Sequence, residues 1–182
     1  MSYFIHTYLI ICMSKLIYGV ECFSYTRYLD LSHKCIRDKP EEINNILDTY
    51  DLRELYMVNS RLDALPDVIM NLSTLEILDA SNNKIIIIPD TVSNLINLQV
   101  LNLSSNPILE IPKKISFLHS LQKLIINDTR ITELPLEIFQ LKNLTKLQLT
   151  NSFISIIPKE LGNLIKLTQL DISKNPIQEL PI

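Results

Sequence analysis

Side chains that could support catalysis or bind a metal are few in this chain and lie far apart. The histidines are His6, His33 and His119, so no two of them are close in sequence. The cysteines all lie in the first fifth of the chain and form no C-x-x-C pair: Cys12, Cys22 and Cys35. Only His33 and Cys35 are near neighbours, and two ligands do not complete a tetrahedral zinc site. The sequence therefore predicts a protein without a catalytic constellation, a bound metal or another cofactor, and not an enzyme.

Glycine is scarce, which excludes the common phosphate-binding loops. The chain has two glycines, Gly19 and Gly162, whereas an average protein has about 7%. Dinucleotide fingerprints and P-loops need several glycines close together, because the backbone must approach phosphate closely. Neither loop fits this sequence.

The overall composition favours a folded chain that does not bind nucleic acid. Hydrophobic residues make up 47% and charged residues 20% of 182 residues, and the net charge is −3. Interspersed charges of both signs give no basic patch for a phosphate backbone. The apolar run near the N-terminus is too short and too interrupted to span a bilayer.

The apolar residues of this chain follow a repeat of 23 residues, and this repeat sets where every other side chain lies. Three apolar positions recur at this spacing. They are Leu52, Leu75, Leu98, Leu121, Leu144 and Leu167, then Leu55, Leu78, Leu101, Leu124, Leu147 and Leu170, then Leu62, Ile85, Ile108, Ile131, Ile154 and Ile177. A proline also recurs in every unit: Pro66, Pro89, Pro112, Pro135, Pro158 and Pro181. An earlier, irregular unit contains Leu29, Leu31, Ile36 and Pro40, and its helically spaced apolar residues at 43–50 predict a short helix after Pro40.

Each unit reads as a short strand that cannot bury its own leucines. In "LEILDAS" (75–81) the apolar Leu78 and Ala80 alternate with Glu76, Asp79 and Ser81, as in a half-buried strand. Stacking such units at about 4.8 Å would join the strands into a parallel sheet and the leucines into one core.

The stretch "LQVLNLSSNPILEIP" (98–112) resembles the leucine-rich repeat pattern L-x-x-L-x-L-x-x-N/C-x-L. With a proline after the later leucine, the repeat is most similar to that of intracellular Ras-group-related leucine-rich repeat proteins. The resemblance implies an α/β solenoid. We expect a curved right-handed coil with short parallel strands on the concave face and loops, 3-10 or short helical turns on the convex face.

The repeat also divides the chain. Residues 26–182 would form an array of about seven units, the last incomplete, behind an apolar segment or cap at 1–25. This segment is an upstream extension if Met13 is the natural start, or a secretory signal if residues 1–19 are removed. We favour a cytoplasmic protein, with secretion as the alternative. Four N-glycosylation sequons, at Asn71, Asn102, Asn127 and Asn143, arise readily from the repeat itself.

The period changes how the four isoleucines at 85–88 are interpreted. Ile85 and Ile88 occupy positions that are apolar in every unit, whereas Ile86 and Ile87 align with variable residues such as Thr132 and Glu133. We therefore expect two core residues flanking two surface residues, and no strand.

An asparagine after each strand normally satisfies backbone groups of adjacent leucine-rich repeats. This chain keeps it at Asn83, Asn106 and Asn175. The other units carry a different residue there, and the polar ladder should be weaker at these points: Lys34, Ser60, Thr129 and Ser152.

Function is then expected at variable positions of the concave face. The candidate protein-binding residues form an apolar stripe with charged and polar neighbours: Tyr28, Tyr56, Val58, Ile77, Asp79, Val100, Asn102, Lys123, Ile125, Lys146 and Gln148. Apolar residues at solvent-facing positions with charged borders are typical of protein interfaces.

These observations predict a non-catalytic protein-interaction module. The resemblance implies a scaffold or signalling regulator whose partner is a small GTPase or another signalling protein. One alternative is a secreted or cell-surface receptor-like protein, with a Cys22–Cys35 bridge. Another is the recognition arm, or a fragment, of a larger enzyme. The open last unit, with Ile172, Ile177 and Leu180, also suggests end-to-end self-association.

Overall fold

The computed structural model describes residues 27–33 and 52–178. The predictions for the N-terminal segment, for the helix after Pro40, for Lys34 and for Leu180 lie outside the described residues.

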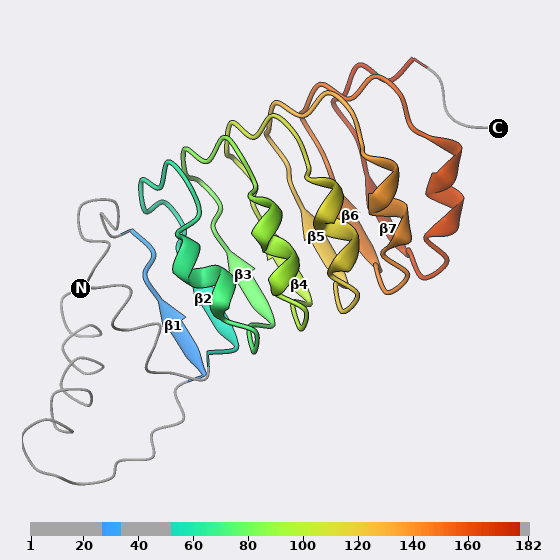
Figure 1. The fold of residues 1–182 in the computed structure, drawn as a ribbon. Coiled ribbons are helices and arrows are strands. Elements are labelled where there is room, and N and C mark those ends of the chain that lie inside the picture. Colours follow the sequence, from blue (N-terminus) through green and yellow to red (C-terminus); the bar gives the residue numbers. More distant parts are fainter. Residues whose placement is uncertain (1–26, 34–51, 179–182) are drawn as a thin grey trace, which may run out of the picture.

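Seven short strands form one parallel sheet, and their order in the sheet is their order in the chain (Figure 1). The strands are β1 (Tyr28–Asp30), β2 (Glu54–Tyr56), β3 (Ile77–Asp79), β4 (Val100–Asn102), β5 (Lys123–Ile125), β6 (Lys146–Gln148) and β7 (Gln169–Asp171). Leu55 pairs with Leu78, and Leu78 pairs with Leu101. Residues one period apart are therefore direct neighbours, and the predicted leucine-rich repeat solenoid is confirmed.

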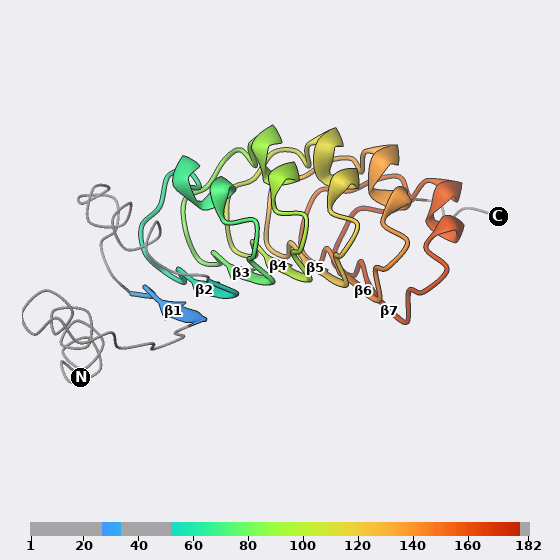
Figure 2. The same cartoon turned by 60° about the horizontal axis from the view of Figure 1, so that its bottom comes forward.

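A five-residue 3-10 helix lies opposite the sheet in each of five units (Figure 2). These helices are η2 (Asp67–Asn71), η3 (Asp90–Asn94), η4 (Lys113–Phe117), η5 (Leu136–Gln140) and η6 (Lys159–Asn163). The recurring proline precedes each helix with φ between −61° and −69°. Proline suits this place because its fixed φ matches the start of a helix and its missing N–H needs no partner.

The space between strands and 3-10 helices is filled by the repeating apolar residues. Leu78, Leu101, Leu124 and Leu147 are fully buried. They belong to one continuous cluster that runs from Leu31 to Leu164. Each unit therefore depends on its neighbours to exclude water from its leucines.

The four consecutive isoleucines divide as the period predicts. Ile85 and Ile88 are 0% and 2% exposed, whereas Ile86 and Ile87 are 47% and 61% exposed. No strand forms over these residues. The strand of this unit lies earlier and ends at Asp79, one residue before Ala80.

The asparagine position links backbone groups of neighbouring units. The side-chain nitrogen of Asn106 donates to the carbonyl oxygens of Ala80 and Leu103 at 3.0 and 2.9 Å. Its side-chain oxygen accepts the backbone N–H of Ile85 at 3.0 Å. Asn83 and Asn175 make the same kinds of contact, although Asn175 is only partly buried.

Serine and threonine reach fewer groups at this position. The hydroxyls of Thr129 and Ser152 lie 2.9 Å apart and bond to each other across two units. Ser60 donates to the carbonyl oxygen of Leu31 at 2.9 Å. A hydroxyl has one proton and a shorter reach than the asparagine amide, so it holds fewer of these backbone groups at once.

Every described turn after a strand places at least one non-glycine residue in the left-handed region. One such residue recurs in each turn, with φ between 51° and 61°: His33, Asn59, Asn82, Ser105, Asp128, Asn151 and Lys174. Asparagine and aspartate tolerate this conformation best, because their short polar side chains can bond locally. The chain turns sharply at this left-handed residue, and the asparagine position follows it directly, as Asn106 follows Ser105.

We predict that Asn106→Ala lowers the free energy of unfolding by about 1–3 kcal/mol, because buried backbone groups lose their partners. Chemical denaturation followed by circular dichroism would measure the loss. The matched control is Asn94→Ala, since Asn94 is exposed on η3. Equal stabilities of the two variants would contradict a structural role for the buried amide.

Candidate protein-binding face

The candidate site is the outer surface of the sheet, which we call the strand face. It is formed by the first and third residue of each strand, because the middle residue points into the core. The strand register aligns the first residues of β2 to β6 into a row across the sheet, which we call the central row: Glu54, Ile77, Val100, Lys123 and Lys146. The third residues form a second row: Asp30, Tyr56, Asp79, Asn102, Ile125, Gln148 and Asp171.

All eleven predicted protein-binding residues lie on or at the edge of this face. Ten stand in the strands, and Val58 follows two residues after Tyr56. Tyr28 and Lys123 are exposed and the other nine are half-buried. Ile77 and Val100 are direct partners in adjacent strands. Ile125 stands diagonally across from Val100, in β5. We call these three aliphatic residues of adjacent strands the apolar patch.

Two tyrosines extend this patch at its N-terminal end. The rings of Tyr28 and Tyr56 lie 5.2 Å apart at a tilt of 43°, a favourable aromatic geometry. The Tyr56 hydroxyl donates to Oε2 of Glu54 at 3.1 Å. Burial, followed by the hydrogen bond to Glu54 and its negative charge, raises the pKa of Tyr56 to about 12. The Tyr56 hydroxyl therefore keeps its proton, and its hydrogen bond to Glu54, to a higher pH than an ordinary tyrosine would.

Asp79 organises the polar groups beside the apolar patch. Its Oδ1 accepts the backbone N–H of Ser81 at 2.9 Å and the Ser81 hydroxyl at 2.6 Å. Its Oδ2 accepts the side-chain amide of Asn102 at 2.8 Å. Ser81 was expected on the solvent side, yet it is only 6% exposed, because its hydroxyl turns toward the Asp79 carboxylate.

Lys123 and Lys146 form the basic end of the central row. They are direct partners in β5 and β6. Like charges in this relation destabilise a sheet. In the described part of the chain, no ion pair or hydrogen bond engages either ammonium group. The row thus carries an acid at one end, two aliphatic residues in the middle and two cations at the other end.

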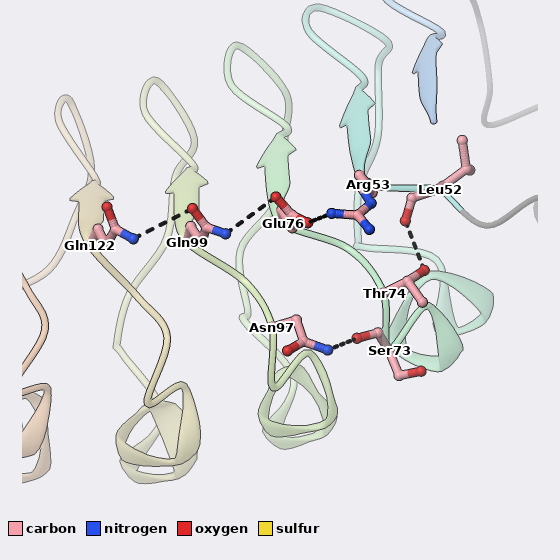
Figure 3. Close-up of polar contacts among 8 residues, drawn as sticks. All are labelled: Leu52, Arg53, Ser73, Thr74, Glu76, Asn97, Gln99 and Gln122. Atoms are coloured by element: carbon pink, nitrogen blue, oxygen red, sulfur yellow. Dashed lines mark hydrogen bonds and ion pairs between the residues drawn. The ribbon is translucent and has the colours of Figure 1, made fainter. Parts of the chain in front are cut away.

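A chain of polar contacts borders the strand face, one residue before the strands (Figure 3). Nη1 of Arg53 forms an ion pair with Oε1 of Glu76. Gln99 donates to Oε2 of Glu76 at 3.2 Å, and Gln122 donates to Oε1 of Gln99 at 3.4 Å. Nε of Arg53 is buried without a partner among the described residues. These four residues stand at variable positions before the strands that the repeat identifies, but they are not among the eleven predicted protein-binding residues.

Two open depressions flank the strand face. One, of about 720 Å³, follows the turns after the strands and is lined by residues that include Asp128, Arg130, Phe153 and Lys174. The other, of about 410 Å³, lies on the opposite edge, where Gln99, Gln122 and Lys166 contribute. Both are shallow and mixed in polarity, so they extend the candidate surface and do not form an enclosed ligand site.

Groups that could perform chemistry are not brought together in the described residues. No set of three histidine, cysteine, aspartate or glutamate side chains there could hold a metal ion. His33 and His119 are both exposed and lie in different turns. His6 and the three cysteines lie outside the described residues. Among the helices that are described, none is long and apolar enough to cross a membrane.

We predict that Tyr56 ionises near pH 12, about two pH units above an ordinary tyrosine. Because its folded pKa is raised, its contribution to stability is complete below pH 10 and is lost between about pH 10 and 12. Phenolate absorbance during an alkaline titration measures this, with Tyr56→Phe as the control that lacks the late transition. Identical titration curves for the two proteins would contradict the assignment.

Comparisons with known proteins agree with this architecture. The family model described as "Leucine-rich repeat region" matches residues 7–106 and 90–175. No curated protein matches the chain in sequence.

Several solved structures share the fold. A leucine-rich repeat protein of Leptospira interrogans is 31% identical, with a TM-score of 0.72, over 76% of this chain and 35% of that protein. An internalin of Listeria monocytogenes is 26% identical, with a TM-score of 0.61, over 76% of this chain and 37% of that protein.

A plant receptor is similar as well. The leucine-rich repeat ectodomain of the Arabidopsis receptor kinase HAESA, solved in complex with a peptide hormone, is 28% identical with a TM-score of 0.63. The match covers 72% of this chain and 23% of that one. The chain therefore spans between 23% and 37% of the length of these proteins. Its repeat, its register and the family match agree, and the chain belongs to the leucine-rich repeat family.

Proposed function

We propose that this chain is a non-catalytic protein-binding module that holds its partner on the strand face. Family membership supports the general function, since leucine-rich repeats are typically protein-interaction modules. The specific face rests on one observation: Ile77, Val100 and Ile125 form an apolar patch where the fold does not need apolar side chains.

The folding requirements of the repeat make this observation informative. The middle residue of β2 to β6 is fully buried in each strand and is always leucine. The outward positions carry no such constraint, and β6 places Lys146 and Gln148 there. Aromatic and aliphatic residues at half of the outward positions of β2 to β5 therefore contribute little to the core but offer a partner a large apolar area.

The size of the face indicates how a partner would bind. Seven strands at about 4.8 Å give a length of about 34 Å, and with a width of about 15 Å the area is roughly 500 Å². A stable interface buries about 800 Å² per partner. The partner is therefore expected to use the strand face together with one of the flanking depressions.

The cellular setting that we propose is the cytoplasm, where the module would act as a scaffold or signalling regulator. The similarity of the repeat to Ras-group-related proteins supports this, and it makes a small GTPase or another signalling protein the expected partner class.

A receptor-like extracellular function is the second candidate, and the similarity to a plant receptor ectodomain favours it. Of the four sequon asparagines, Asn102, Asn127 and Asn143 already use their side chains in hydrogen bonds. Asn71 is exposed at the end of η2 and would accept a glycan. Sequencing the N-terminus of the protein purified from its own cells would separate the two settings, because removal of residues 1–19 requires secretion.

We predict that a photo-crosslinking amino acid at Val100 captures a protein partner in the cells that make this chain, because Val100 lies centrally in the apolar patch. The crosslinked products would be separated by electrophoresis and identified by mass spectrometry. The matched control carries the same amino acid at Leu136, which is 55% exposed on η5, opposite the sheet.

The comparison between the two positions decides the proposal. A product formed from Val100 and absent from Leu136 supports binding on the strand face. Equal products from both positions, or products from Leu136 alone, would exclude the strand face as the main binding surface.

A further inference from the structure

The central row of the strand face has a chemical order that runs across the sheet. From β2 to β6 it reads acid, aliphatic, aliphatic, cation, cation: Glu54, Ile77, Val100, Lys123 and Lys146. The residues are direct partners in successive strands, so the order is linear in space. This arrangement is more specific than an apolar patch, because the two ends of a bound segment would meet opposite charges.

Neither end of the row is neutralised within the described chain. Oε2 of Glu54 accepts the Tyr56 hydroxyl, which leaves the carboxylate charged and able to accept another donor. Asp79 in the neighbouring strand adds a second negative charge at the same end. At the other end, the two adjacent ammonium groups have no counter-ion among the described residues.

The spacing of the row matches an extended peptide. Glu54 and Lys123 are separated by three strand spacings, which is about 14 Å. In an extended segment, side chains two positions apart share a face and are separated by about 6.8 Å, so residues four positions apart are also about 14 Å apart. The side chain halfway along would lie between Ile77 and Val100.

We propose that the strand face binds an extended partner segment that carries a basic, an apolar and an acidic residue at alternate positions. The basic residue contacts Glu54, the apolar one lies on Ile77 and Val100, and the acidic one contacts Lys123, with Lys146 one strand spacing further on. This inference rests on the proposed function and specifies the chemistry of the partner. The segment runs across the strands. It can run from its N-terminus to its C-terminus in either direction, because the order of contacts depends only on its side chains.

The lysine pair gives a second reason for this partner. Adjacent like charges oppose sheet pairing, and removing one charge or reversing it would relieve that repulsion. An acidic side chain from a partner would compensate both cations together, and charge-assisted contacts to lysine are stronger than neutral hydrogen bonds. The lysine pair therefore destabilises the isolated chain slightly, and a bound acidic side chain would remove that cost.

A peptide selection tests the proposal even while the natural partner is unidentified. Random peptides displayed on phage would be selected against the full chain. The consensus peptide would then be synthesised with a fluorescent label and titrated by fluorescence polarisation. We expect a consensus of basic, apolar and acidic residues at alternate positions, and an affinity that falls as salt rises from about 0.05 to about 0.5 M.

Charge reversal identifies the contact. The double variant Lys123→Glu and Lys146→Glu is expected to weaken binding of the consensus peptide about tenfold or more. The control variant Lys113→Glu and Lys159→Glu makes the same change in net charge on exposed residues of η4 and η6, opposite the sheet. It should bind within about twofold of the original chain. Thermal melts report folding, and a single Lys123→Glu change should leave the melting temperature unchanged or raised.

The outcomes separate this inference from the proposed function. Peptides whose binding is lost in Val100→Asp but whose consensus lacks the acidic position would overturn the inference and leave the strand face as a binding surface. A consensus peptide that binds equally to both double variants would also overturn it. A selection in which no peptide depends on Val100 would overturn it too, and the crosslinking at Val100 and Leu136 would then decide the proposed function independently.

Discussion

In-register stacking of parallel strands is the constraint on which the rest of the structure depends. A single 23-residue unit has too little interior to bury its own leucines, so each unit gains its core from the units on both sides. The strand register meets this requirement, because it places the middle leucines of successive strands side by side: Leu55, Leu78, Leu101, Leu124 and Leu147. The same register fixes the outward residues into rows, because a strand cannot align its inward side chains without aligning the outward ones.

The buried asparagine position adds specificity to this stacking. Apolar burial alone would tolerate small shifts between units, but Asn106 bonds to backbone atoms of its own unit and of the unit before it. Where Thr129 and Ser152 replace asparagine, the two hydroxyls bond to each other and leave more of the alignment to packing. The polar ladder is therefore uneven along the described part of the array, and a hydroxyl pair replaces the amide contacts after β5 and β6, which carry the two cations of the central row.

Most of the fold followed from the sequence because a period constrains both sides of a strand at once. The period correctly predicted the parallel strands and the split of Ile85 and Ile88 from Ile86 and Ile87, and the family resemblance correctly implied the 3-10 turns opposite the sheet. That the recurring proline begins these turns was shown by the structure alone. Details that depend on one side chain turning toward another were not predictable. The burial of Ser81 under Asp79 and the pairing of Arg53 with Glu76 are of this kind. The left-handed conformations of Ser105 and Lys174 were equally hidden, because neither residue type indicates φ > 0, unlike the asparagine or aspartate that most other units carry at this position.

The candidate site is less determined by the sequence than the fold is, and the physical reason lies in the energetics of the outward rows. Inward positions contribute large burial energies, so substitutions there are strongly selected by folding. Outward positions contribute little, and a stable array could carry almost any polar residues there. The central row instead places Ile77 and Val100 between Glu54 and two adjacent lysines. Since Lys123 and Lys146 repel each other, and since the aliphatic pair is only half-buried, stability of the isolated chain does not account for this order. A complementary segment that covers the aliphatic pair and neutralises both ends does account for it.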